Sequence, residues 1–94
     1  MKIAVCDDQE IFLDQMEKIL EKQEEIEGYR LFQQVEALWK DMEEGASYDV
    51  ILMDIEWKGK NKNGIQYASE INERFPDSRI VFVTSYNDRY SQEI

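Results

Sequence analysis

The sequence predicts an α/β domain with a doubly wound parallel sheet whose strands lie in the order 2-1-3-4. Three short, almost entirely apolar segments, 2–6, 49–53 and 79–83, are typical of strands that are buried on both faces of a sheet. Segments with helical spacing of apolar residues separate them, which implies right-handed crossovers between parallel strands. The segment 29–35 is more polar, so we expect it at an edge of the sheet and the other strands at its centre.

The first two predicted helices rest on the spacing of their apolar residues and on the glycine that ends each. We expect one helix over residues 9–25, ended by Gly28, and a shorter one over 36–45, which ends at Gly45. The apolar residues that mark these helices are Phe12, Met16, Ile19 and Leu20 in the first, and Leu38, Trp39 and Met42 in the second.

The remaining part of the chain carries a loop, a third helix and the last strand. Residues 57–64 are rich in glycine and asparagine, which is typical of a loop. A helix then follows, marked by apolar residues at Ile65, Ala68, Ile71 and Phe75, and it is closed by Pro76. After the strand at 79–83, we expect residues 84–94 to form a loop and the first turns of another helix.

Length and composition limit the classes of function. With 94 residues, 43% of them hydrophobic, the chain is sufficient for one domain with a core. Its net charge of −10 argues against nucleic-acid binding by this segment and against binding to anionic membranes. There is no histidine, and we expect the single cysteine, Cys6, to be a small buried hydrophobe. We find no signal-peptide pattern and no run long enough to span a bilayer, so we expect a cytoplasmic protein.

Acidic residues lie at the carboxyl ends of the first and third strands. The winding direction reverses between these strands, and a crevice opens at that point in doubly wound sheets. Asp7 and Asp8 follow the first strand and Asp54 follows the third, so we expect three carboxylates to converge. Because like charges repel, the cluster favours a hard divalent cation such as Mg²⁺, and it argues against zinc. Mg²⁺ beside a carboxylate indicates phosphoryl transfer, with one aspartate as the nucleophile.

Each of these residues also has an ordinary structural interpretation. Asp7 or Asp8 could cap the first helix, with Glu10 completing a capping box. Asp54 could be a loop residue that follows a strand, and a residue such as Thr84 is more often structural than functional. The joint arrangement favours a functional site, because all of these positions except Glu10 lie at carboxyl ends of central strands.

Three motifs resemble the receiver domain of two-component response regulators. These are "VCDD" after the first strand, "ILMD" at the end of the third and "VFVTS" at the end of the fourth, and the resemblance covers the whole chain. It implies a flavodoxin-like receiver fold. The stretches "MKIAVCDD" and "MDIE" further resemble receivers of regulators that carry a LytTR-type DNA-binding domain.

The resemblance implies a role in signal transduction and assigns roles to individual residues. A sensor histidine kinase would phosphorylate Asp54, and the domain would pass a conformational signal to an output domain outside this chain. It would not be an enzyme beyond slow self-phosphorylation and self-dephosphorylation. The implied Mg²⁺ ligands are Asp8, Asp54 and the carbonyl of Glu56, with Asp7 acting through water. Thr84 would bind phosphoryl oxygens, Ser85 would leave room for phosphate and the attacking water, and Tyr86, like Glu56, would tune phosphoryl loss.

The sequence departs from the receiver pattern in two places. The loop after Asp54 is longer than usual, and its lysines, at positions 58, 60 and 62, do not stand in for the family's phosphate-contacting lysine. The chain also ends at Ile94, without a counterpart of the fifth strand and last helix, so we interpret 1–94 as a partial receiver domain. The apolar strand 79–83 would then be a sheet edge, and we expect self-association, with a homodimer as one outcome.

Two other classes of function stay open at this point. A Mg²⁺-dependent phosphohydrolase of the haloacid-dehalogenase type would also use Asp54 as nucleophile, but it would need an aspartate where this chain has Glu56. A receiver-like binding module would keep the fold without the phosphoryl chemistry. Turnover of a phosphate ester would favour the first, and failure to take up a phosphoryl group would favour the second.

Overall fold

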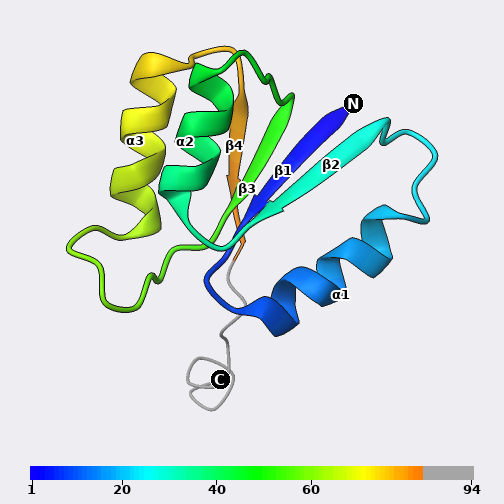
Figure 1. Ribbon diagram of the computed structural model, residues 1–94, viewed down its shortest axis with the longest axis horizontal. Helices are drawn as coiled ribbons and strands as arrows, with labels where there is room; N and C mark the ends of the chain where they lie inside the picture. Colours follow the sequence, from blue (N-terminus) through cyan, green and yellow to red (C-terminus); the bar gives the residue numbers. More distant parts are fainter. Residues whose placement is uncertain (84–94) are drawn as a thin grey trace, which may run out of the picture.

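The computed structural model describes residues 1–83, which form a four-stranded parallel sheet in the order β2-β1-β3-β4. Helices cover both faces: α2 and α3 lie side by side on one, and α1 lies on the other (Figure 1). This confirms the predicted fold class and strand order. The elements are β1 (Lys2–Cys6), α1 (Glu10–Leu20), β2 (Gly28–Phe32), α2 (Val35–Glu43), β3 (Val50–Met53), α3 (Gly64–Arg74) and β4 (Arg79–Phe82).

The strands are apolar because successive side chains enter the cores on opposite faces of the sheet. Ala4 and Cys6 point into the core under α2 and α3, whereas Ile3 and Val5 point into the core under α1. All four of these residues are buried. Cys6 is therefore the small buried hydrophobe that was predicted, and burial strongly raises the pKa of its thiol.

The first helix is shorter than its sequence pattern predicts. It ends at Leu20 and not near residue 25, because residues 21–25 are all polar and offer nothing to bury against the sheet. Gly28 does not end the helix but opens β2, where it pairs with Lys2. In place of further helix, the ammonium group of Met1 donates a hydrogen bond to a side-chain oxygen of Glu27 at 2.8 Å.

Two apolar side chains assigned to buried helix faces are in fact exposed. Ile19 is 53% exposed and Ile65 is 54% exposed. The buried face of α1 is centred on Leu13 and Leu20, which lie two turns apart, and Ile19 lies beside this face. In α3 the buried residues follow the spacing i, i+3, i+4 and i+7 from Gly64, so Ile65 faces outward and Tyr67 is buried instead.

Within residues 1–83, β4 pairs only with β3 and forms an edge of the sheet, as the predicted order 2-1-3-4 implies, although its apolar sequence alone favoured a central position. Val81 is 40% exposed and Phe82 is 43% exposed.

We find no helix in this part of the chain that is long and apolar enough to cross a membrane. The helix expected within 84–94 lies outside the described residues.

Candidate functional site: an acidic cleft at the carboxyl ends of β1 and β3

Three carboxylates converge at the carboxyl ends of the two central strands, as predicted. Carboxylate oxygens of Asp7, Asp8 and Asp54 all lie within 4.8 Å of one another. The pairing of β1 with β3 causes this convergence, because Cys6 lies opposite Met53 and the amide of Asp54 donates a hydrogen bond to the Cys6 carbonyl at 3.0 Å. The aspartates that follow both strands therefore meet at the same edge.

Local hydrogen bonds hold two of these carboxylates in place. The amide of Gln9 donates to Oδ1 of Asp7 at 2.8 Å, and the amide of Lys58 donates to Oδ2 of Asp8 at 3.0 Å. Neither aspartate caps α1, whose N-cap is Gln9 without a side-chain hydrogen bond. The capping interpretation of the sequence is therefore wrong, and both side chains face the cleft between the strands.

Asp54 has a carboxyl group whose pKa is raised. Its side chain is 4% exposed, and this burial, followed by the charge of Asp7, raises the pKa of its carboxyl from 3.8 to about 6. Backbone hydrogen bonds from Glu56 and Ile55 oppose the rise without cancelling it. At neutral pH the Asp54 carboxylate is thus ionised at an energetic cost, which a bound cation would reduce.

The donor set of the cluster suits a hard divalent cation. All the available ligand atoms are carboxylate oxygens, the chain has no histidine, and the one thiol is buried in β1. Among the described residues, neither Asp8 nor Asp54 forms an ion pair with lysine or arginine. Oxygen-only ligands are those that Mg²⁺ prefers, so the residues present fit this ion.

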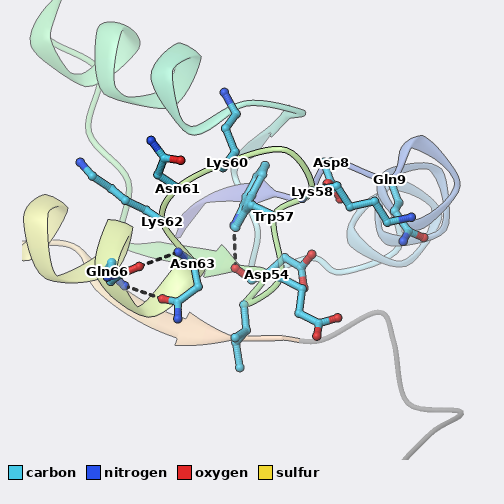
Figure 2. Close-up of a pocket in the computed structure, with 12 residues that line it drawn as sticks. Asp8, Gln9, Asp54, Trp57, Lys58, Lys60, Asn61, Lys62, Asn63 and Gln66 are labelled. Atoms are coloured by element: carbon cyan, nitrogen blue, oxygen red, sulfur yellow. Dashed lines mark hydrogen bonds between the residues drawn. The ribbon is translucent and has the colours of Figure 1, made fainter.

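A cavity of about 590 Å³ opens beside the cluster, and the loop from Trp57 to Asn63 forms its opposite wall (Figure 2). Trp57 anchors the loop: its buried indole N–H donates to the main-chain carbonyl of Asp54 at 2.8 Å, and its ring packs edge-on against Tyr67. We did not predict this role for Trp57. The sequence signal that could have indicated it is a large aromatic residue in an otherwise polar loop.

The first turn of α3 is fitted against the backbone of the site. The amide of Gly64 donates to the Ile55 carbonyl at 2.7 Å, and a Cβ at Gly64 would lie 1.9 Å from the Asp54 carbonyl oxygen. Asn63 and Gln66 form a reciprocal capping box, which begins the helix at this point. The sequence signal for this start, an asparagine three residues before a glutamine, is local and was overlooked.

Of the other predicted site residues, only Glu56 lies within residues 1–83. Glu56 is exposed and lines the cavity, next to Asp54. Thr84, Ser85 and Tyr86 lie outside the described residues. The last described residue, Val83, donates its amide hydrogen to the Met53 carbonyl at 2.9 Å, beside the strand end that carries Asp54.

The fold and the cleft define a class of protein: a doubly wound α/β domain with an acidic site where the winding reverses. The model of the response regulator receiver domain family matches residues 3–93. The chain therefore belongs to the receiver domains of response regulators. This confirms the family resemblance of the sequence motifs and argues against the phosphohydrolase alternative. A search among curated proteins finds no match.

Solved structures of the response regulator RcsB resemble the chain closely. A complex of RcsB with DNA has a TM-score of 0.80 at 26% identity, over 94% of this chain and 44% of RcsB. RcsB from Salmonella enterica serovar Typhimurium, bound to the rprA promoter with phosphomimetic BeF₃⁻, has 0.79 at 26%, over 93% and 44%. Its isolated REC domain with BeF₃⁻ has 0.79 at 24%, over 99% and 67%. The chain thus spans less than half the length of these DNA-bound RcsB chains.

Proposed function

We propose that this receiver domain accepts a phosphoryl group on Asp54 from a phosphohistidine of a sensor kinase, and that it passes a conformational signal to an output domain. The observation that carries the proposal is the meeting of three carboxylates within 4.8 Å in a chain of the receiver family. The raised pKa of Asp54 supports the proposal, because such a carboxylate is poorly compensated until a cation binds beside it.

Each residue of the cleft would have a separate role in phosphoryl transfer. An Asp54 carboxylate oxygen would attack phosphorus, forming the P–O bond of an aspartyl phosphate while the P–N bond to the kinase histidine breaks and its electron pair returns to the ring. Asp8, Asp54 and the Glu56 carbonyl would hold Mg²⁺, with Asp7 acting through water. The ion would supply charge neutralisation for the transferring group. Thr84 and Ser85 would accommodate the phosphoryl oxygens.

The partners follow from the same proposal. The DNA complexes of RcsB support an output domain that binds DNA and lies outside residues 1–94, with 1–94 as a partial receiver domain. The resemblance to LytTR-type regulators stays a prediction. Direct DNA binding by this segment is disfavoured by its net charge of −10. The expected self-association through β4, with a homodimer as one outcome, also stays a prediction.

Phosphoryl uptake tests the proposal directly. With Mg²⁺ and acetyl phosphate, the purified protein should gain one acid-stable, base-labile phosphoryl group, detected by intact mass. Asp54→Asn should gain none, because the nucleophilic oxygen is lost. Asp14→Asn is the matched control: Asp14 lies exposed on α1, and its loss should leave labelling unchanged. Equal labelling of Asp54→Asn and the parent would show the acceptor to be elsewhere, and no labelling of the parent would favour a phosphate-independent module.

Binding of Mg²⁺ in the cleft should be visible in tryptophan fluorescence. Trp57 lines the cavity beside Asp54. Trp39, which belongs to α2, instead packs against Phe75 at the end of α3. We expect Mg²⁺ to change the emission of the parent and of Trp39→Phe, but not of Trp57→Phe. A fluorescence change that is lost in Trp39→Phe and kept in Trp57→Phe would place the ion outside this cleft.

A further inference from the structure

The cavity beside Asp54 is lined by side chains of both charges. Asp8, Asp54 and Glu56 are among its lining residues, and the loop that follows Glu56 contributes three lysines, at positions 58, 60 and 62. From their position in the sequence, these lysines were not expected to take part in the site. The structure nevertheless places all three around the cavity that Asp54 also lines. The question is which of them is able to meet a phosphoryl group there.

Two of the three lysines are already engaged elsewhere. Nζ of Lys60 lies 3.5 Å from a carboxylate oxygen of Glu36 on α2, and Nζ of Lys62 pairs with Glu70 on α3. Figure 2 shows both side chains pointing away from Asp54. The Nζ group of Lys58 forms no ion pair within residues 1–83, and its side chain lies at the Asp8 side of the cavity.

The main chain of Lys58 is fixed to the acidic cluster. Its amide donates to Oδ2 of Asp8 at 3.0 Å, and carboxylate oxygens of Asp8 and Asp54 lie within 4.8 Å. The side chain itself is exposed and rises from this fixed point on a flexible four-carbon stem. An ammonium group on such a stem is able to turn from the rim of the cavity toward a phosphoryl group on Asp54.

We propose that Lys58 binds the phosphoryl oxygens carried by Asp54, as a cation supplied by the extended loop. The inference rests on the proposed function. A phosphoryl group brings a charge of about −2 to a site that already holds Asp7 and Asp8, and one Mg²⁺ leaves this sum negative. A lysine ammonium is a mobile point charge that suits phosphate, and hydrogen bonds between ionised groups are the strong ones. Lys58 therefore acts on the phosphorylated site and not on the unphosphorylated one.

A phosphoryl analogue separates this role from metal binding. The Trp39→Phe protein, whose tryptophan emission comes from Trp57 alone, is titrated with beryllium fluoride at saturating Mg²⁺ and, in parallel, with Mg²⁺ alone. Lys58→Gln should weaken beryllium fluoride binding at least tenfold, the equivalent of losing one hydrogen bond to a charged group. Its affinity for Mg²⁺ alone should stay the same or rise slightly, because a nearby positive charge has been removed. Lys58→Arg should retain most of the parent's affinity for the analogue.

Lys60→Gln is the matched control, with the same charge change in the same loop around the same cavity. We expect it to bind beryllium fluoride within about twofold of the parent, since exposed ion pairs contribute little. An equal loss in Lys60→Gln and Lys58→Gln, or no loss in either, would overturn the inference and leave the proposed function intact. A joint loss of Mg²⁺ affinity in Lys58→Gln would also overturn it. A parent that binds no analogue at all would overturn both.

Discussion

Gly64→Ala should destabilise the domain by about 3 kcal/mol or more and disturb the acidic cleft at the same time. An added Cβ would lie 1.9 Å from the carbonyl oxygen of Asp54 and 2.8 Å from the Cα of Ile55. Both neighbours are main-chain atoms, so no side-chain rotation relieves the clash. The first turn of α3 must move away from the strand end that carries Asp54, and the hydrogen bond from the Gly64 amide to Ile55 is lost.

Urea unfolding of the parent and the variant measures this effect. Gly28→Ala is the matched control: the glycine begins β2 without a positive φ, and no atom lies within 4 Å of an added Cβ. We expect the control to lie within about 1 kcal/mol of the parent. The Mg²⁺-dependent fluorescence change should weaken only in Gly64→Ala. A Gly64→Ala protein as stable as Gly28→Ala would show that α3 does not need its close approach to Asp54.

Asp54→Asn should make the metal-free protein more stable at pH 7.5, by about 1–3 kcal/mol. The reason is the raised pKa of Asp54, from 3.8 to about 6, through burial and the neighbouring charge of Asp7. Below pH 3.8 the carboxyl is protonated in both the folded and the unfolded state, and the substitution has little effect. Between 3.8 and about 6 the folded state keeps a proton that the unfolded state releases, so stability falls as pH rises. Above about 6 the full cost of the buried charge is present, and a neutral asparagine side chain at this position would avoid it.

Urea unfolding at pH 5 and pH 7.5 in the presence of a chelator tests the sign. The advantage of Asp54→Asn should be larger at pH 7.5, and Asp14→Asn, which removes an exposed charge on α1, is the matched control. Added Mg²⁺ should remove most or all of this advantage: the parent gains about 2.7 kcal/mol when free ion is a hundredfold above its dissociation constant, and the variant gains little. A variant that is less stable than the parent without metal would contradict the account of Asp54 as a strained carboxylate.

Much of the fold and the core of the site could be predicted from local patterns. The almost entirely apolar segments at 2–6, 49–53 and 79–83 identified three of the four parallel strands, because such runs are typical of strands in a parallel sheet with helices on both faces. The carboxyl ends of parallel strands lie at one edge of the sheet, and this rule predicted from the sequence that Asp7, Asp8 and Asp54 would lie close together, as they do. The family resemblance of their flanking motifs was confirmed by the match over residues 3–93.

The helix boundaries and faces were predicted less well. Apolar spacing placed Ile19 and Ile65 in the core, but both are more than half exposed, and α1 ends five residues earlier than predicted because its polar continuation has nothing to pack against. An isolated periodic pattern reports that one helix face is buried, and it does not say which of two adjacent apolar residues faces the sheet. The position of each helix over the sheet decides that.

The sequence by itself thus determined the fold class, the strand order and the acidic cluster, since each depends on short-range patterns and one topological rule. Only the tertiary structure decided what surrounds Asp54. The Lys58 amide reaches Asp8 across fifty positions in the chain, and Gly64 meets the Asp54 carbonyl only because α3 packs closely against the end of β3. Such contacts depend on the path of a loop through space. No local periodicity encodes that path, so the position of Lys58 beside the acidic cleft became visible only in the folded chain.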